Sequence, residues 1–418
     1  MKDIKRDLYL NKLIDSKENS MIKVITGIRR CGKSYLIFNL YYDYLLSIGV
    51  KKSHIIKIAI DKKGNEKFRD AATLESFIEE QIKDDKMYYI FLDEIQLVPD
   101  FEYVLNGLNR IKNADIYVTG SNSKFLSTDI ITEFRGRGDE IRVYPLSFNE
   151  FLSAYLGSKE EAWVEYFTYG GLPLILTLKT SEQKSKYLNT LFEKTYLTDI
   201  IDRNKLQKDN VLESVINILA SSVGSLTNPL KLANTFTSEG IKGVSNKTIN
   251  SYICYLIDGF MINKAERYDV KGKKYISTPS KYYFTDIGLR NAKLNFRQQE
   301  ENHLMENIIY NELLIRGYNV DVGVVEHWTT DMQGKRIKKQ LEVDFVCNQG
   351  SKRYYIQSAF AIPDREKMEQ EQNSLIRIDD SFKKIIIVKD YIKLWRNDQG
   401  VVIMSLQEFL LNNDSLDL

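Results

Sequence analysis

One short segment constrains the fold of this chain more than any other. Residues 27–34 read GIRRCGKS, which fits the pattern G-x-x-x-x-G-K-[ST]. The apolar run IKVIT (22–26) precedes the segment, and the helix-forming run YLIFNLYYDYLL (35–46) follows it. A strand, a glycine-rich loop and a helix in this order are the local structure that the pattern requires. We therefore predict an α/β fold whose first loop binds phosphate groups.

Each position of this loop has a physical role in the interpretation. The glycines let the backbone curl so that its amides point at phosphates, Lys33 reaches the β and γ phosphates of a nucleotide, and Ser34 ligates Mg²⁺. A chance glycine-rich turn is the alternative, and the strand and helix on either side argue against it. The expected nucleotide contacts are Gly27, Ile28, Arg29, Arg30, Cys31, Gly32, Lys33, Ser34 and Tyr35.

Short apolar runs recur along the first 145 residues, separated by polar, helix-like stretches. After IKVIT they are HIIKIAI (54–60), MYYIFLD (87–93), ADIYVTG (114–120) and EIRVY (140–144). Strands that are buried on both faces read as continuous apolar runs, and strands that alternate with helices form parallel sheets. We therefore predict a P-loop core with a mainly parallel sheet over residues 1–145.

An acidic pair, Asp93 and Glu94, ends the run MYYIFL. Open α/β sheets bind ligands at the carboxyl edge of their strands, which is where this pair would lie. We expect Asp93 to hold Mg²⁺, usually through water, and Glu94 to orient and deprotonate the attacking water. The alternative is a pair that merely ends a strand, and the neighbouring P-loop favours the functional interpretation.

Two further groups are candidates for acting on the γ-phosphate. Ser121, Asn122 and Ser123 follow ADIYVTG, and either Ser121 or Asn122 would position the water or sense hydrolysis, although a plain polar turn explains them equally well. Arg135 and Arg137 lie just before the last core strand. An arginine donated across a subunit boundary stabilises the transferring phosphoryl group, and Arg137 is the favoured candidate. That role requires a homo-oligomer, whereas a solvated basic turn does not.

The rest of the chain divides into three further segments. Aromatic and leucine spacing predicts a helical lid or adaptor over residues 146–207. Three helix-length segments, followed by two extended stretches around a Lys-Gly-Lys turn, predict a winged-helix domain over 208–292. A helix, three extended runs, another helix and the strand KKIIIVKD predict a second, smaller α/β domain over 293–418.

Several blocks of sequence carry a family resemblance that covers nearly the whole chain. In the first half they are GIRRCGKS, FLDEIQ, VTGSNS, RGRGDEIRVYPLSFNEF and YGGLP, and in the second half KYYFTDIGLRNA, MENIIYNELLIRGY, EVDFV and YYIQSAF. The chain thereby resembles the prokaryotic AAA-type ATPases that carry a C-terminal domain of unknown function. The resemblance implies an AAA+ core that uses ATP and Mg²⁺, a winged helix, and a C-terminal domain similar to the PD-(D/E)XK nuclease (restriction-endonuclease-like) fold.

In that nuclease fold, Glu306, Asp344 and Gln357 fall at the first three metal-site positions. A metal-dependent nuclease clusters carboxylates around Mg²⁺ and usually adds a lysine two residues after the third ligand. Gln357 is neutral where an acid is expected, and Ala359 stands where the lysine is expected. A non-catalytic binding domain is therefore favoured over an active nuclease.

The winged helix leaves its partner open between DNA and protein. Candidate DNA contacts are Asn246, Lys247 and Asn250 in the recognition helix and Lys271, Lys273 and Lys274 in the wing. The whole chain gives no further argument, because 59 Lys and Arg nearly balance 57 Asp and Glu. Winged helices also dock proteins or act as internal switches.

Composition suits a cytoplasmic protein that does not enter a membrane. The chain shows no signal peptide and no apolar stretch of about 18 residues, and its three cysteines and three histidines lack metal-ligand spacing. The leading hypothesis is an ATP-hydrolysing switch or motor, with DNA as a candidate partner through the winged helix. The alternatives are a nucleotide-gated DNA-binding or signalling module with slow hydrolysis, and an ATP-dependent nuclease.

Overall fold

The computed structural model describes residues 4–120, 136–206, 210–241, 244–297, 300–330 and 334–418. The chain divides into two compact units. The first comprises the described residues of Met1–Leu146 together with Leu172–Thr177 and Asp258–Phe260. The second comprises Ser147–Gly171, Leu178–Ile257 and Met261–Leu418. The prediction of four domains stays a prediction.

The first unit is built on a five-stranded sheet with the order β2-β3-β4-β1-β5. All of its strands run parallel. The strands are β1 (Ile22–Thr26), β2 (Ile55–Ala59), β3 (Tyr88–Asp93), β4 (Ala114–Thr119) and β5 (Gly138–Arg142). β1 is flanked by β4 and β5, so the loop that follows it emerges between the ends of two other strands. This confirms the parallel-sheet core expected from the apolar runs.

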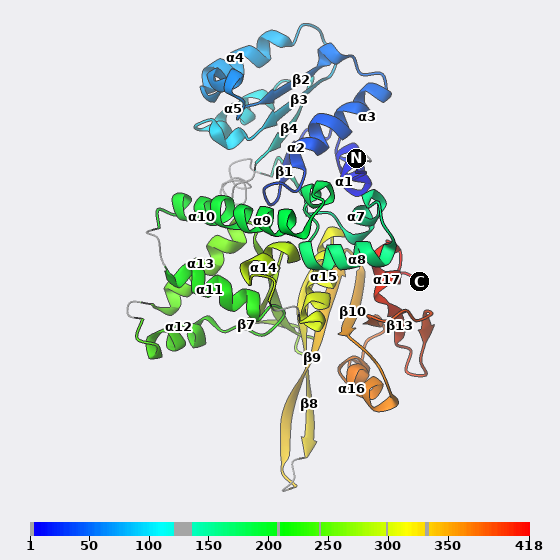
Figure 1. The fold of residues 1–418 in the computed structure, drawn as a ribbon. Coiled ribbons are helices and arrows are strands. Elements are labelled where there is room, and N and C mark those ends of the chain that lie inside the picture. The colour runs from blue at the N-terminus through cyan, green and yellow to red at the C-terminus, as the bar shows by residue number, and fades with distance from the viewer. Residues whose placement is uncertain (1–3, 121–135, 207–209, 242–243, 298–299, 331–333) are drawn as a thin grey trace. The chain divides into compact units, whose positions relative to one another are not determined.

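Helices cover both faces of this sheet (Figure 1). They are α1 (Asp7–Asp15), α2 (Lys33–Tyr35), the π-helical η1 (Leu36–Tyr41), α3 (Tyr42–Ser47), α4 (Ala71–Gln81) and α5 (Phe101–Leu108), with short 3₁₀ turns η2 (Lys52–His54), η3 (Lys63–Arg69) and η4 (Ile95–Leu97). On one face, Leu74 of α4 and Leu105 of α5 join the buried core with Ile90. On the other face, the Tyr41 ring lies 5.8 Å from Phe91 and 4.9 Å from Tyr117.

The second unit begins with helices. They are α7 (Phe148–Ala154), α8 (Lys159–Tyr169), α9 (Ser181–Leu191), the π-helical η7 (Phe192–Leu197), α10 (Thr198–Arg203), α11 (Asn210–Ser221), α12 (Pro229–Ser238), α13 (Asn246–Asp258) and α14 (Ile287–Lys293). The 3₁₀ turn η6 (Pro173–Thr177) lies between α8 and α9 in the sequence but belongs to the first unit. Capping boxes fix the starts of α7, α8 and α9, because each cap satisfies amides that the first helical turn leaves unpaired. Helices α7 to α10 agree with the helical pattern of this part of the sequence, and the lid or adaptor over residues 146–207 stays a prediction.

The sheet of the second unit joins strands from two segments that the sequence pattern separates. Its order is β12-β13-β11-β10-β9-β8-β6-β7. The strands are β6 (Ile262–Asp269), β7 (Lys274–Phe284), β8 (Asn319–Thr330), β9 (Arg336–Gln349), β10 (Lys352–Ala359), β11 (Lys383–Val388), β12 (Trp395–Arg396) and β13 (Val402–Ser405), and the helices are α15 (Glu301–Ile315), α16 (Arg365–Ile376) and α17 (Leu406–Leu411). A parallel pairing of Arg267 with Val322 links the β6–β7 hairpin to the rest. One continuous sheet therefore spans the predicted winged-helix and C-terminal segments.

The register of β8 and β9 shifts by one residue at one point. Asp321 pairs with Val346 and Gly323 pairs with Val343, so two residues of β8 span three of β9. The extra residue is a β-bulge, which breaks the usual alternation of faces. Val343 and Val346 accordingly belong to one buried cluster, although they are three positions apart.

No helix in the described ranges is both long and apolar enough to cross a bilayer.

Candidate nucleotide-binding site

The loop between β1 and α2 has the backbone that its glycines were expected to provide. Gly27 and Gly32 have φ angles of 131° and 102°, values that favour glycine. A Cβ on Gly27 would also collide with the carbonyl oxygen of Val143. Ile28 and Cys31 are buried, Arg29 is half-buried, and Arg30 and Tyr35 are exposed. The loop therefore curls tightly over the end of β1 and enters the helix at Lys33.

Lys33 is held inside the loop. Its side chain is 5% exposed, and its ammonium donates hydrogen bonds to the carbonyl oxygens of Gly27 at 2.8 Å and Ile28 at 3.1 Å. These neutral carbonyls position the ammonium without cancelling its charge. The start of the helix adds amides that point outward and a positive dipole end. The loop thus offers a fixed positive charge suited to phosphate groups.

Asp93 lies next to the loop at the end of β3. Its Oδ1 accepts a hydrogen bond from the Ser34 hydroxyl at 3.0 Å and another from the hydroxyl of Thr119. Burial raises the pKa of Asp93, and the hydrogen bonds from Thr119 and Ser34 oppose that rise. A hydroxyl and a carboxylate in contact form the oxygen donor set that Mg²⁺ prefers beside phosphates. The residues present therefore fit a magnesium ion with a nucleotide.

Glu94 follows Asp93 in a left-handed backbone conformation, with φ of 55°. This conformation is uncommon outside glycine and turns the next side chain away from the strand direction. The backbone amide of Glu94 donates to Thr119 Oγ1 at 3.2 Å, and the Gln96 amide donates to Glu94 Oε2. The Glu94 carboxylate is half-buried and is oriented by Gln96.

Sequence reasoning missed three residues of this site. Thr119 and Gln96 contact the acidic pair as described, and the signal for Thr119 was its place at the end of the strand next to β3. Arg6 is 4% exposed and donates to the carbonyl oxygens of Cys31 at 3.0 Å and Tyr144 at 2.7 Å. Arg6 thereby ties the loop to the segment after β5, a long-range contact that no local pattern reveals.

Arg137 lies at the opposite edge of the sheet from the loop. It precedes Gly138, which pairs with Ile22 at the start of β1, whereas Arg142 pairs with Thr26 at the end. The five residues of β5 separate the two ends of this strand by roughly 16 Å. Arg137 is exposed, so it could act as an arginine finger only on a nucleotide bound to another chain. That role stays a prediction. Ser121, Asn122 and Arg135 lie outside the described residues.

The predicted nuclease-like residues lie together in the second unit, with one unexpected companion. Glu306 on α15 and Asp344 on β9 both face the ammonium of Lys281 on β7, at 2.9 and 3.6 Å. Gln357 follows Ile356, which pairs with Phe345, so Gln357 lies beside Asp344 in β10. The sequence pattern predicts a lysine at position 359, where Ala359 stands. Lys281 could not be predicted as a member of this cluster, because it belongs to the segment assigned to the winged helix.

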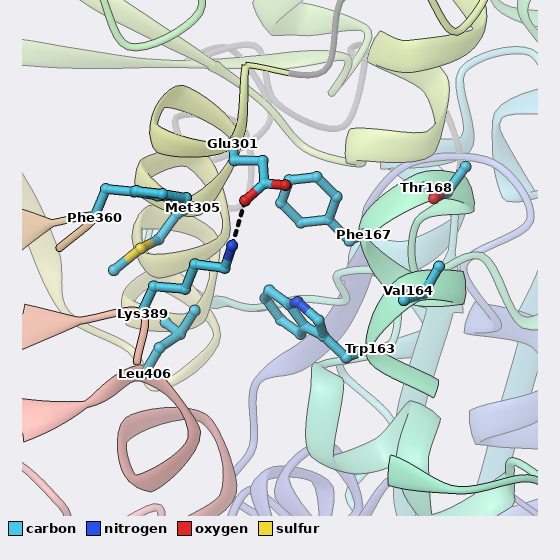
Figure 2. A pocket seen from close by; sticks show the side chains of 9 residues that line it. All are labelled: Trp163, Val164, Phe167, Thr168, Glu301, Met305, Phe360, Lys389 and Leu406. Atoms are coloured by element: carbon cyan, nitrogen blue, oxygen red, sulfur yellow. Dashed lines mark hydrogen bonds and ion pairs between the residues drawn. The ribbon is translucent and has the colours of Figure 1, made fainter. Parts of the chain in front are cut away.

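A pocket of about 290 Å³ also opens in the second unit (Figure 2). Trp163 and Phe167 of α8 point from one side toward Glu301 and Lys389 on the other. Glu301 and Lys389 form an ion pair, and the other side chains that line the pocket are apolar apart from Thr168. The lining therefore combines an apolar surface with one ion pair and one hydroxyl.

Comparison with known proteins identifies the domain that holds this candidate site. A family model described as an AAA domain matches residues 19–152, the range that holds the parallel sheet, the loop and the acidic pair. A second model, a domain of unknown function, matches residues 160–300. Residues 19–152 therefore form an AAA domain, and this domain carries the P-loop sequence at residues 27–34.

Similar whole chains give the family. The chain is 35% identical over 415 residues to an uncharacterized protein of Haemophilus influenzae, covering 98% of each chain. It is 28% identical over 413 residues to an uncharacterized protein of Methanocaldococcus jannaschii, covering 93% of this chain and 86% of the other. The chain belongs to the same family as the Haemophilus influenzae protein.

Among solved structures the likeness is distant. The Aeropyrum pernix ORC1 protein in complex with DNA matches with a TM-score of 0.32 and 12% identity, over 70% of this chain and 93% of that one. This distance is too great to carry a conclusion about ligands or partners.

Proposed function

We propose that this protein binds ATP with Mg²⁺ at residues 27–35 and hydrolyses it, and that it works as a molecular switch or motor. The observation that carries the proposal is the contact of Ser34 with Asp93 at 3.0 Å beside the buried Lys33 ammonium. This contact joins the phosphate-binding loop to the acidic end of the neighbouring strand. A nucleotide site needs both parts in one place.

The side chains divide the chemistry between them. Mg²⁺, when bound, neutralises charge on the phosphate oxygens. Lys33 holds the phosphate chain, and Ser34 and Asp93 hold the ion. Glu94 accepts the proton from the attacking water while Gln96 fixes one of its oxygens. The water oxygen bonds to the γ-phosphorus, and the bond to the β–γ bridging oxygen breaks.

Replacing Glu94 with Gln tests this assignment. Gln keeps the shape and the Gln96 neighbour but cannot take up a proton, so we expect hydrolysis to fall about 10²–10⁴-fold with ATP binding retained. Steady-state phosphate release and equilibrium ATP binding are the two measurements. The matched control is Glu66→Gln, an exposed glutamate of the same unit. Normal turnover in the Glu94→Gln protein would rule out the base assignment.

A nucleotide-gated DNA-binding or signalling module with slow hydrolysis is the second candidate. Asn246, Lys247 and Asn250 are exposed on α13. Lys271 and Lys273 in the β6–β7 turn and Lys274 at the start of β7 are exposed as well. Exposed side chains of this kind suit phosphate contacts. Running the same hydrolysis assay with and without duplex DNA separates a motor from this module, because DNA should stimulate hydrolysis by a motor and need not change the slow hydrolysis of the module.

A homo-oligomer belongs to the same proposal. Arg137 is too far from the loop of its own chain to act there, so an arginine finger at this position would serve a neighbouring subunit.

A further inference from the structure

A lysine lies at the centre of the acidic cluster in the second unit. Lys281 is 4% exposed, and its Nζ lies 2.9 Å from Glu306 Oε1, 2.7 Å from Glu342 Oε1 and 3.6 Å from Asp344 Oδ1. These partners come from α15 and β9, whereas Lys281 comes from β7. One ammonium therefore connects three elements that are far apart in the sequence.

The β-bulge in β9 supplies part of this geometry. Glu342 and Asp344 lie on the face opposite Val343, as alternation requires. The bulge then lets Phe345 follow Asp344 on the same side, where its ring lies 6.1 Å from both Tyr283 and Tyr310. Asp344 is thus buried beside the Lys281 ammonium and directly precedes the residue that joins this group of aromatic rings.

Two of the acids accept a further hydrogen bond. The Tyr283 hydroxyl donates to Glu306 Oε1 at 2.6 Å, and the Ser358 backbone amide donates to Asp344 Oδ2 at 2.8 Å. A divalent cation bound to Glu306 Oε1 or to Asp344 would need these same oxygens at roughly 2.0–2.6 Å. To reach them it would have to displace a buried ammonium that already makes the contacts.

The charges favour the ammonium as well. Burial alone would lower the pKa of Lys281, but Glu306, Asp344 and Glu342 outweigh it and raise that pKa. Burial, and next the charge of Glu306, raise the pKa of Asp344, and Lys281 opposes that rise. The contacts with three acidic side chains therefore keep a charged ammonium favourable in this buried position.

We infer that Lys281 is the resident cation of this cluster and holds the place that a nuclease-like site would give to a metal ion. The second unit is then stabilised without a metal, and the cluster does not cleave phosphodiester bonds. No group of three or more His, Cys, Asp or Glu in the described ranges is arranged to hold a metal ion. This inference stands independently of the ATPase proposal, because every residue in it belongs to the second unit.

Removal of the Lys281 ammonium would leave a group of oxygen atoms suited to a metal ion. Gln357 Oε1 is buried and has no hydrogen-bond partner among the described residues, and it lies beside Asp344 in the sheet. Without Lys281, three carboxyl groups and this amide oxygen would remain with no cation among them. Oxygen ligands of this kind suit Mn²⁺ or Mg²⁺.

The experiment compares full-length proteins with Lys and with Met at position 281, without nucleotide and with Asp93→Asn in both to silence the nucleotide site. We expect the protein with Lys281 to show no heat of Mn²⁺ binding and the same unfolding temperature in Mn²⁺ and in EDTA. The Lys281→Met protein should unfold at a lower temperature in EDTA, regain stability in Mn²⁺, and lose that gain when Asp344→Asn is added. Lys274→Met, an exposed lysine of the same strand, is the control.

Two further variants keep the test decisive if Lys281→Met does not fold. Lys281→Arg should fold without metal, and Lys281→Met/Glu342→Gln should fold better than the single variant because one negative charge is gone. Mn²⁺ binding to the Lys281 protein that Asp344→Asn abolishes, or metal-dependent cleavage of DNA or RNA by that protein, would overturn the inference. A folded Lys281→Met protein that ignores Mn²⁺ would overturn it too.

Discussion

Single buried side chains hold several loops of this protein in place, and Asp286 shows the physics most simply. It is 2% exposed, and its carboxyl accepts backbone hydrogen bonds from Leu289 at 3.0 Å and Gly171 at 2.8 Å. One carboxyl therefore caps α14 and anchors the glycine pair after α8. Burial raises its pKa to about 6, although hydrogen bonds from Gly171, Leu289 and Gly288 oppose the rise.

This pKa predicts a pH dependence of stability. The folded-state pKa lies above that of an exposed aspartate, about 3.9, so the folded state favours the protonated carboxyl. The contribution of this carboxyl to the free energy of unfolding is complete below about pH 4 and is lost as the pH rises through about 6. The unfolding temperature of the unmodified protein should therefore fall as the pH rises through about 6. Because Asn stays neutral, we expect the Asp286→Asn protein to lack this part of the fall. Thermal melts from about pH 4 to 7 measure it.

The control is Asp364→Asn, which changes an exposed helix-capping aspartate at the start of α16. An Asp286→Asn protein with the same pH slope as the unmodified protein would contradict the assignment.

The sequence predicts the residues of the nucleotide site where a motif specifies them. Lys33, Ser34 and Asp93 lie in contact or within one loop of each other, as their spacing predicted. Arg6 and Gln96 could not be predicted, because a side-chain bond to a distant carbonyl leaves no periodic pattern. Lys281 was missed for a related reason: its partners lie in elements whose pairing is set by long-range packing.

Helices and strands could likewise be predicted from the sequence only where a local pattern specifies them. The expected strands around residues 22–26, 87–93 and 383–388 are confirmed as β1, β3 and β11, because continuous apolar runs identify strands buried on both faces. The order of strands within each sheet could not be predicted, nor could the pairing of β6 with β8. The bulge in β9 is likewise invisible locally, since Val343 to Val346 reads as an ordinary strand.

Gly323 allows a prediction about that bulge. A Cβ at this position would lie 2.9 Å from Val343 Cβ and 2.9 Å from Val346 Cγ2, so the two valines that flank the bulge leave no room for it. We expect Gly323→Ala to lower the free energy of unfolding by about 1–3 kcal/mol, the usual cost of overpacking. Chemical denaturation measures the change. Gly64→Ala, with open space around its Cβ, is the control, and equal stabilities of the two variants would contradict the packing argument.

At the scale of the whole molecule, the chemistry and the second sheet belong to different units. Every described residue of the candidate nucleotide site lies in the first unit, and the Lys281 cluster lies in the second. The sequence pattern suggests four domains because it registers changes of local periodicity. Compactness instead follows contacts between distant segments, which join the β6–β7 hairpin to the C-terminal strands in one sheet.

The central claim is that the loop at residues 27–35 and the acidic end of β3 bind a Mg-nucleotide together. Titration calorimetry with Mg-ATP, and with Mg-GTP for comparison, tests it directly on the unmodified protein and on Lys33→Ala, with Lys63→Ala as the exposed control. We expect heat of binding at one site per chain in the unmodified and Lys63→Ala proteins, and none in Lys33→Ala. No heat with either nucleotide in the unmodified protein, or equal heat in Lys33→Ala, would contradict it.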